Sequence, residues 1–136
     1  MIRAVIDTSV LVSAFIGRAD RAPAQLVAAW RDRAFTLVVS PMLLDELAEV
    51  LARPKFARWS DDGRGLAYAA AFAARAELHA DSDASGATRD PNDDYLVALA
   101  RSAQADLVVS VDRDLLDAEL GDVTVMDPAG FLARLT

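Results

Sequence analysis

Short runs of apolar, often β-branched residues alternate along the chain with longer stretches rich in alanine and leucine. The short runs predict strands buried on both faces, and the longer stretches, with apolar positions three or four apart, predict helices. We expect strands at Ala4–Ile6, Thr36–Val39, Leu107–Val109 and Val123–Met126, with Glu77–His79 as a weaker fifth. We expect helices at Ser9–Phe15, Pro23–Arg33, Met42–Ala52, Asp62–Glu77, Asn92–Gln104, Asp114–Leu120 and Ala129–Leu135. This rhythm is typical of an α/β fold in which a central parallel sheet of four to five strands is covered by helices on both faces.

Three of the expected helices are preceded by the same start signal, a capping residue followed by proline. The pairs are Ser40-Pro41, Asp90-Pro91 and Asp127-Pro128. A Ser or Asp side chain can accept a hydrogen bond from a free N–H of the first turn, and proline is well tolerated at the first helical position. The segment 81–89, rich in Asp, Ser, Gly and Ala, is expected to be a surface loop.

The amino-acid composition excludes several classes of active site but says little about the fold. The 136 residues are expected to form a single domain, 1–136, and a net charge of −7 with 54% hydrophobic residues argues against disorder and against a basic nucleic-acid coat. The absence of cysteine excludes zinc fingers and thiol nucleophiles, and a single histidine, His79, argues against a Ser-His-Asp triad.

Asp7 interrupts the apolar N-terminal run, so we expect no export signal, no membrane span and a cytoplasmic location.

Two acidic residues stand where expected strands end. The first strand runs directly into Asp7, and Leu107–Val109 continues through Ser110 and Val111 to Asp112. Both acids therefore fall at the carboxyl edge of a parallel sheet, where open α/β folds hold their ligands.

Helices that follow such strands begin at the same edge, so an acid in their first turns also lies there. At about 100° per residue, the helix after Thr36–Val39 has one apolar stripe, formed by Leu43, Leu44, Leu47, Val50 and Leu51. Glu46 flanks this stripe, whereas Asp45 and Glu49 face away. In the helix that begins near residue 92, the same construction places Asp93 on the side facing the core and Asp94 nearer solvent, so Asp93 is preferred and Asp94 stays the alternative.

Four carboxylates at one edge, from Asp7, Glu46, Asp93 and Asp112, would repel one another unless a cation lay among them. Oxygen ligands without His or Cys select hard ions, so Mg²⁺ or Mn²⁺ is expected. One or two such ions suit phosphodiester chemistry because they generate hydroxide from bound water and screen the phosphate.

Each acid taken singly has a simpler interpretation as a helix cap or a turn residue. Their coincidence at one edge favours a shared site, because capping alone would not require it. Ser9 and Ser110 could hold a water or a phosphate oxygen there, although such serines more often form hydrogen bonds with the backbone.

The stretch from Arg53 to Arg64 contains four basic residues with Phe56 and Trp59, which suits contact with a nucleic acid. Its two aspartates, and the frequency of Phe and Trp in cores, argue against that interpretation.

Four segments together resemble one known family: Asp7–Val10, Ser40–Phe56, Asp90–Ala100 and Val109–Leu115. In this order they are similar to PIN domains, in particular the VapC-like ribonucleases that act as toxins in prokaryotic toxin–antitoxin pairs. The resemblance covers essentially the whole chain. It implies a Rossmann-like fold and metal-dependent ribonuclease activity.

The resemblance also implies roles for particular residues. The family's four acids fall on Asp7, Glu46, Asp93 and Asp112, and Asp90 and Asp94 become accessory ligands. Its small polar residues near the first and last acids fall on Ser9 and Ser110. It further implies a homodimer and a small antitoxin protein as partner.

We therefore expect a Mg²⁺- or Mn²⁺-dependent endoribonuclease that cleaves RNA. The net charge of −7 predicts weak, salt-sensitive binding of RNA. Two alternatives are a phosphate-handling α/β protein, such as a phosphatase or a receiver-like phosphoacceptor, and a non-catalytic interaction module. Lys55 is the only lysine and position 9 is a serine, which argues against a receiver and against a phosphatase of the Asp-x-Asp type.

Overall fold

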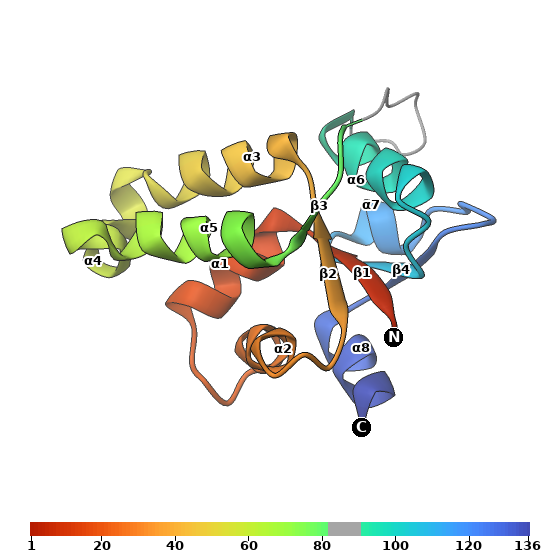
Figure 1. The fold of residues 1–136 in the computed structure, drawn as a ribbon, viewed down its shortest axis with the longest axis horizontal. Coiled ribbons are helices and arrows are strands. Elements are labelled where there is room, and N and C mark those ends of the chain that lie inside the picture. Colours follow the sequence, from red (N-terminus) through yellow and green to blue (C-terminus); the bar gives the residue numbers. More distant parts are fainter. Residues whose placement is uncertain (82–90) are drawn as a thin grey trace.

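A computed structural model describes residues 1–81 and 91–136, with side chains for 1–81 and 95–136. The described part contains one parallel sheet of five strands in the order β3-β2-β1-β4-β5 (Figure 1). The strands are β1 Arg3–Ile6, β2 Thr36–Val39, β3 Glu77–Leu78, β4 Leu107–Val109 and β5 Thr124–Met126. The predicted α/β class, the parallel sheet and the short fifth strand are confirmed.

Strand β1 lies at the centre of the sheet between β2 and β4. Its last residue, Ile6, is in register with Val109 at the end of β4. The residues that follow these two strands therefore leave the sheet side by side, and the backbone N–H of Asp7 donates to the carbonyl of Val109 over 2.8 Å. This register brings the two strand-end segments 7–9 and 110–112 together.

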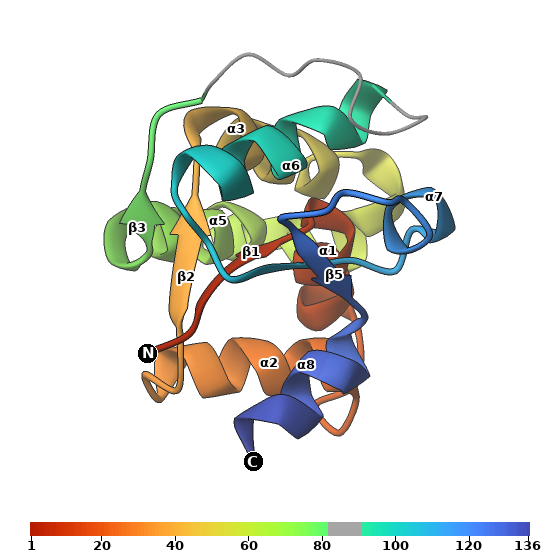
Figure 2. The same cartoon turned by 90° about the vertical axis from the view of Figure 1, so that its right-hand side faces the viewer.

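Helices cover both faces of the sheet. One face carries α1 Thr8–Ile16, α2 Ala22–Arg31, α3 Pro41–Leu51 and α5 Arg64–Arg75, and the other carries α6 Pro91–Ser102 and α7 Arg113–Leu116 (Figures 1 and 2). Helix α8, Pro128–Leu135, packs beside α2. The core between these layers includes the fully buried Phe72 and Phe131. No helix in the described ranges is long and apolar enough to cross a membrane.

Two of the three predicted helix caps can be examined, and both are present. The hydroxyl of Ser40 accepts from the N–H of Leu43 at 3.2 Å, and the carboxylate of Asp127 accepts from the N–H of Gly130 at 2.7 Å. The third cap, at Asp90, and the expected loop 81–89 apart from its first residue lie outside the described residues.

Several predicted helix boundaries were wrong because of local backbone conformation. Helix α5 begins at Arg64 and not at Asp62, since Asp62 and Gly63 have φ angles of 62° and 78°, which no right-handed helix allows. Helix α2 ends at Arg31 because Arg33 adopts a φ of 63°. Helix α7 ends at Leu116 and is shorter than expected.

The segment between α3 and α5 also holds structure that the sequence did not predict. It forms a 3₁₀ turn at Pro54–Phe56, the short helix α4 Ala57–Ser60 and a second 3₁₀ turn at Asp61–Gly63. Figure 1 shows α3 and α5 lying side by side and extending from the sheet, with α4 at their far end. We refer to residues 53–59 as the arm tip.

Candidate functional site

Asp7 is a buried carboxylate at the carboxyl end of the central strand. Its side chain is only 8% exposed and serves as the N-cap of α1, with Oδ1 accepting from the N–H of Ser9 at 3.4 Å. Its other oxygen, Oδ2, accepts from the hydroxyl of Ser110 at 2.8 Å. Both oxygens are thus fixed in position by residues at the same edge of the sheet.

Ser110 connects the two strand ends. Its side chain is fully buried, and its Oγ both donates to Asp7 and accepts from the backbone N–H of Asp112 at 3.0 Å. Asp112 in turn caps α7 through Oδ1, which accepts from the N–H of Asp114 at 2.8 Å. Asp7 and Asp112 therefore do cap helices, as the simpler interpretation predicts. It does not exclude a second role, because the capped carboxylates converge.

Glu46 reaches the same region from α3. Its side chain is half-buried, whereas Asp45 and Glu49 are exposed, so the helical-face prediction is confirmed. One carboxylate oxygen, Oε2, accepts a hydrogen bond from the hydroxyl of Tyr95 on α6. This contact joins helices on opposite faces of the sheet across its carboxyl edge.

The electrostatics of the site favour a positive charge. Burial raises the pKa of Asp7, and the neighbouring carboxylate of Asp112 raises it further, while hydrogen bonds from Ser110 and Ser9 counteract part of this shift. Burial and the hydrogen bond to Glu46 likewise raise the pKa of Tyr95, which therefore stays a neutral donor. A cation beside Asp7 and Asp112 would offset both the burial and the repulsion.

The three carboxylates border one pocket of about 590 Å³. Its wall is formed by one face of α1, one face of α3 and the segment after β4. Asp7, Glu46 and Asp112 contribute its acidic part, and Arg53 and Phe56 of the arm tip also line it.

The donor set of this pocket fits a hard divalent cation. All the charged donors are carboxylates, which Mg²⁺ and Mn²⁺ prefer. Within residues 1–81 and 95–136, no group of three acidic or histidine side chains is compact enough to hold an ion by itself. The remaining predicted ligands are Asp93 and Asp94, which lie in the first turn of α6 but have no described side chains, and Asp90, which lies outside the described residues.

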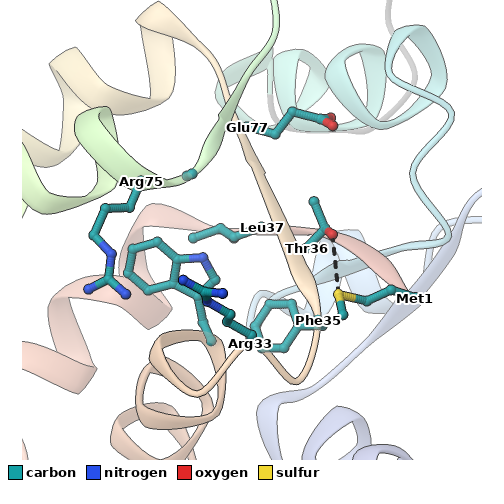
Figure 3. Close-up of a pocket in the computed structure, with 9 residues that line it drawn as sticks. Met1, Arg33, Phe35, Thr36, Leu37, Arg75 and Glu77 are labelled. Carbon is teal, nitrogen blue, oxygen red and sulfur yellow. Dashed lines mark hydrogen bonds between the residues drawn. The ribbon is translucent and has the colours of Figure 1, made fainter.

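A second pocket, of about 500 Å³, lies at the opposite edge of the sheet, where β2 and β3 begin (Figure 3). Trp30, Phe35, Arg33 and Arg75 line it, and its one carboxylate, Glu77, is paired with Arg3 at 2.6 Å. Trp30 and Phe35 belong to the hydrophobic core. This pocket offers no unpaired acid, so the candidate site is the pocket at the carboxyl edge.

The fold and the site define a class of protein: a Rossmann-like α/β domain with paired carboxylates at the carboxyl ends of its central strands. A family model described as "PIN domain" matches residues 3–114, and the chain belongs to the PIN-domain family.

Solved structures agree with this fold. The protein PAE2754 from Pyrobaculum aerophilum is 18% identical, with a TM-score of 0.65 over 98% of this chain and 89% of that one. VapBC2 from Rickettsia felis, solved bound to a DNA fragment from its promoter, is 14% identical, with a TM-score of 0.65 over 93% of this chain and 98% of that one. No curated protein matches this chain significantly.

Sequence reasoning missed one residue of the site, Tyr95. Tyr95 lies beside the apolar stripe of α6, where a tyrosine is usually a core residue, and it is only 7% exposed. A signal was nevertheless present, since a buried tyrosine hydroxyl needs a partner and Tyr95 directly follows the acidic helix start.

Proposed function

We propose that this protein is a metal-dependent endoribonuclease of the VapC-like type, the toxin of a toxin–antitoxin pair. The observation that carries the proposal is the pocket at the carboxyl edge, which Asp7, Glu46 and Asp112 share. Nuclease activity is the chemistry generally associated with PIN domains, and the family match covers the segments that hold these residues.

In this proposal Asp7, Glu46, Asp93 and Asp112 hold one or two Mg²⁺ or Mn²⁺ ions, with Asp90 and Asp94 as accessory ligands. When bound, the ions supply a water nucleophile and stabilise charge on the phosphate. The chain positions the ligands. Ser110 orients Asp7, the N–H of Asp114 orients Asp112, and Tyr95 orients Glu46. Such supporting contacts restrict the carboxylates to few rotamers.

The toxin role rests on two lines of support. The motifs resemble toxin components, and VapBC2 shares the fold over nearly the full length of both chains. We infer a small antitoxin protein as partner, a homodimeric assembly and a cytoplasmic location, for which the absence of cysteine is suitable.

The direct test of this proposal is metal-dependent cleavage of RNA. The purified protein should cleave single-stranded RNA in Mg²⁺ or Mn²⁺, lose the activity in excess EDTA and regain it when the metal is restored. Cleavage that persists in EDTA would contradict the proposal, as would the absence of cleavage of cellular RNA at any concentration of either metal.

Tyr95→Phe tests the contact that orients Glu46. We expect cleavage to fall about tenfold, since loss of a hydrogen bond to a metal-ligating side chain typically costs 10–100-fold in affinity or activity. The apparent affinity for Mn²⁺ should fall with it. The matched control is Tyr68→Phe, which also removes a buried hydroxyl, one that donates to the carbonyl of Leu11 over 2.6 Å away from the carboxylates. Equal activity losses in the two variants would show a general effect of destabilisation.

A further inference from the structure

The pocket at the carboxyl edge continues beyond the carboxylates. Along α3, Glu46 and Val50 are four residues apart on one face, which lines the pocket, and Arg53, two residues beyond the end of the helix, lines it as well. Along α1, Ser9, Val12 and Ile16 are three and four residues apart, so they share a face that also lines the pocket.

This arrangement gives the pocket two chemically different ends. From Glu46 to its last residue, Leu51, helix α3 rises by about 8 Å at 1.5 Å per residue, and Arg53 follows two residues later. The lining combines the carboxylates of Asp7, Glu46 and Asp112, apolar and hydroxyl side chains of α1 with Val50 of α3, and the arginine and phenylalanine of the arm tip beyond the end of α3. A ligand that fills this length must combine an anionic group, apolar flat surface and a second anionic group.

The arm tip, residues 53–59, carries three basic residues and no acidic one, in a chain whose net charge is −7. Two of its cations lie over aromatic rings: Lys55 is 5.0 Å from the ring centre of Phe56, and Arg58 is 4.7 Å from that of Trp59. Arg53 is paired with Glu49 at 3.5 Å, but both side chains are substantially exposed, so the pair is weak and exchangeable. These positive charges are available to an anionic ligand.

One expected member of the basic stretch does not share this role. The guanidinium of Arg64 donates to the backbone carbonyls of Asp61 and Arg58, and it thereby stabilises the turn before α5. The basic stretch therefore divides into a part that lines the pocket, ending at Phe56, and a part that holds the arm together.

We propose that the arm tip holds the RNA strand beside the cleaved bond, with Arg53 binding a backbone phosphate and Phe56 stacking on an unpaired base. This inference rests on the proposed function, and it adds roles for Arg53 and Phe56 in holding the strand. A nucleic-acid strand presents phosphates and flat bases in alternation, which matches the order of charged and apolar side chains along the pocket. In a duplex the base would be stacked and paired, so the ring of Phe56 selects a strand whose bases are free.

Binding, measured without turnover, tests this inference separately from catalysis. The probe is a short fluorescein-labelled RNA without self-complementarity, either alone or annealed to its complement. Fluorescence anisotropy is recorded in Mg²⁺ with each substitution placed in an Asp7→Asn background, so that no strand is cut. Because the readout is affinity, an arm-tip effect would be detected even if the protein were shown to cleave nothing.

The two arm-tip variants should differ in a characteristic way. Phe56→Ala should weaken binding of the single strand about tenfold with an unchanged salt dependence, because stacking on an aromatic ring is worth about that much per base. Arg53→Gln should weaken binding severalfold and reduce the slope of log affinity against log salt by about 0.7, as expected for one lost phosphate contact on a single strand. The exposed Arg134→Gln on α8 is the matched control and should change neither quantity.

Phe56→Leu separates stacking from packing, because leucine keeps an apolar side chain against the core and lacks a ring. It should bind RNA nearly as weakly as Phe56→Ala while unfolding at the same temperature as the parent. Wild-type affinity in Phe56→Leu, or equal losses for the single strand and the duplex in Phe56→Ala, would overturn the proposal.

Discussion

Replacing Asp7 with asparagine should reduce Mg²⁺-dependent RNA cleavage by about 10³-fold or more and should also make the metal-free protein more stable. Cleavage is lost because a metal-ligating carboxylate contributes several kcal/mol, and each 1.36 kcal/mol is a tenfold rate effect. Stability rises because asparagine carries no charge to bury, while its side-chain oxygen can still cap α1 at Ser9.

The pH dependence of this stability gain has a defined sign. Burial raises the pKa of Asp7 in the folded state above its ordinary value of 3.8, so the folded protein binds this proton more tightly than the unfolded chain does. The wild type therefore loses stability as the pH rises from below 3.8 through the folded-state pKa, and the loss is complete once the pH lies above that pKa. Asp7→Asn avoids that loss. Its melting temperature without metal should be higher than that of the wild type above the folded-state pKa, and the difference should vanish below the unfolded pKa.

The control for this experiment is Asp32→Asn, which changes an exposed aspartate at the end of α2. It should leave both cleavage and melting temperature unchanged. Full cleavage by Asp7→Asn would reject the assignment of the site. A lower melting temperature of that variant at neutral pH would show that the capping interaction outweighs the buried charge.

The neighbouring pair Asp45 and Glu46 provides the second large effect. Glu46→Gln should lower cleavage about 100-fold, because it removes a charged ligand that borders the pocket. Asp45→Asn should leave cleavage within about twofold of the wild type, since its exposed side chain faces away from the stripe that packs on the core. The two rates are compared under identical metal and RNA concentrations.

Because these two residues are adjacent on one helix, each variant serves as the control for the other. Both remove one negative charge from α3, so any general electrostatic effect on RNA binding is shared. A large loss in Asp45→Asn with a tolerated Glu46→Gln would overturn the assignment of faces on α3.

Much of the fold was predictable because local signals and tertiary structure agree. The runs at Thr36–Val39 and Leu107–Val109 are strands with the predicted bounds, and Ser40 and Asp127 cap helices as expected. Such agreement arises where buried strands are almost wholly apolar and the capping residue precedes proline. The order of the strands in the sheet was not predictable, because no local pattern indicates which strands pair.

The prediction failed where a single backbone angle decides the structure. Asp62 adopts a left-handed conformation, which aspartate tolerates but does not require. The sequence therefore contained no signal that α5 would begin after this residue. The sequence indicated a basic stretch at the arm tip but no helical turns there. In the structure that proline begins a 3₁₀ turn that places Phe56 against the pocket.

The sequence predicted which edge of the sheet holds the site and which acidic residues lie there, but it did not predict the contacts that orient their side chains. Asp7, Glu46 and Asp112 border one pocket, as the strand-end argument requires. The Tyr95–Glu46 hydrogen bond joins α6 to α3, residues 49 apart in sequence, and depends on how two helices meet across the sheet edge. Their roles as metal ligands, together with that of Asp93, stay predictions that the experiments above address.

The central claim is that carboxylates from separate elements bind a shared divalent cation. The most direct measurement is a crystal structure of the protein grown with Mn²⁺, with data collected to locate the ion by its anomalous scattering. We predict an anomalous peak between the carboxylates of Asp7 and Asp112, in contact with Asp93, with Glu46 bound to the ion directly or through water. A well-ordered pocket without any such peak at saturating Mn²⁺, or a peak bound by other residues, would contradict this account.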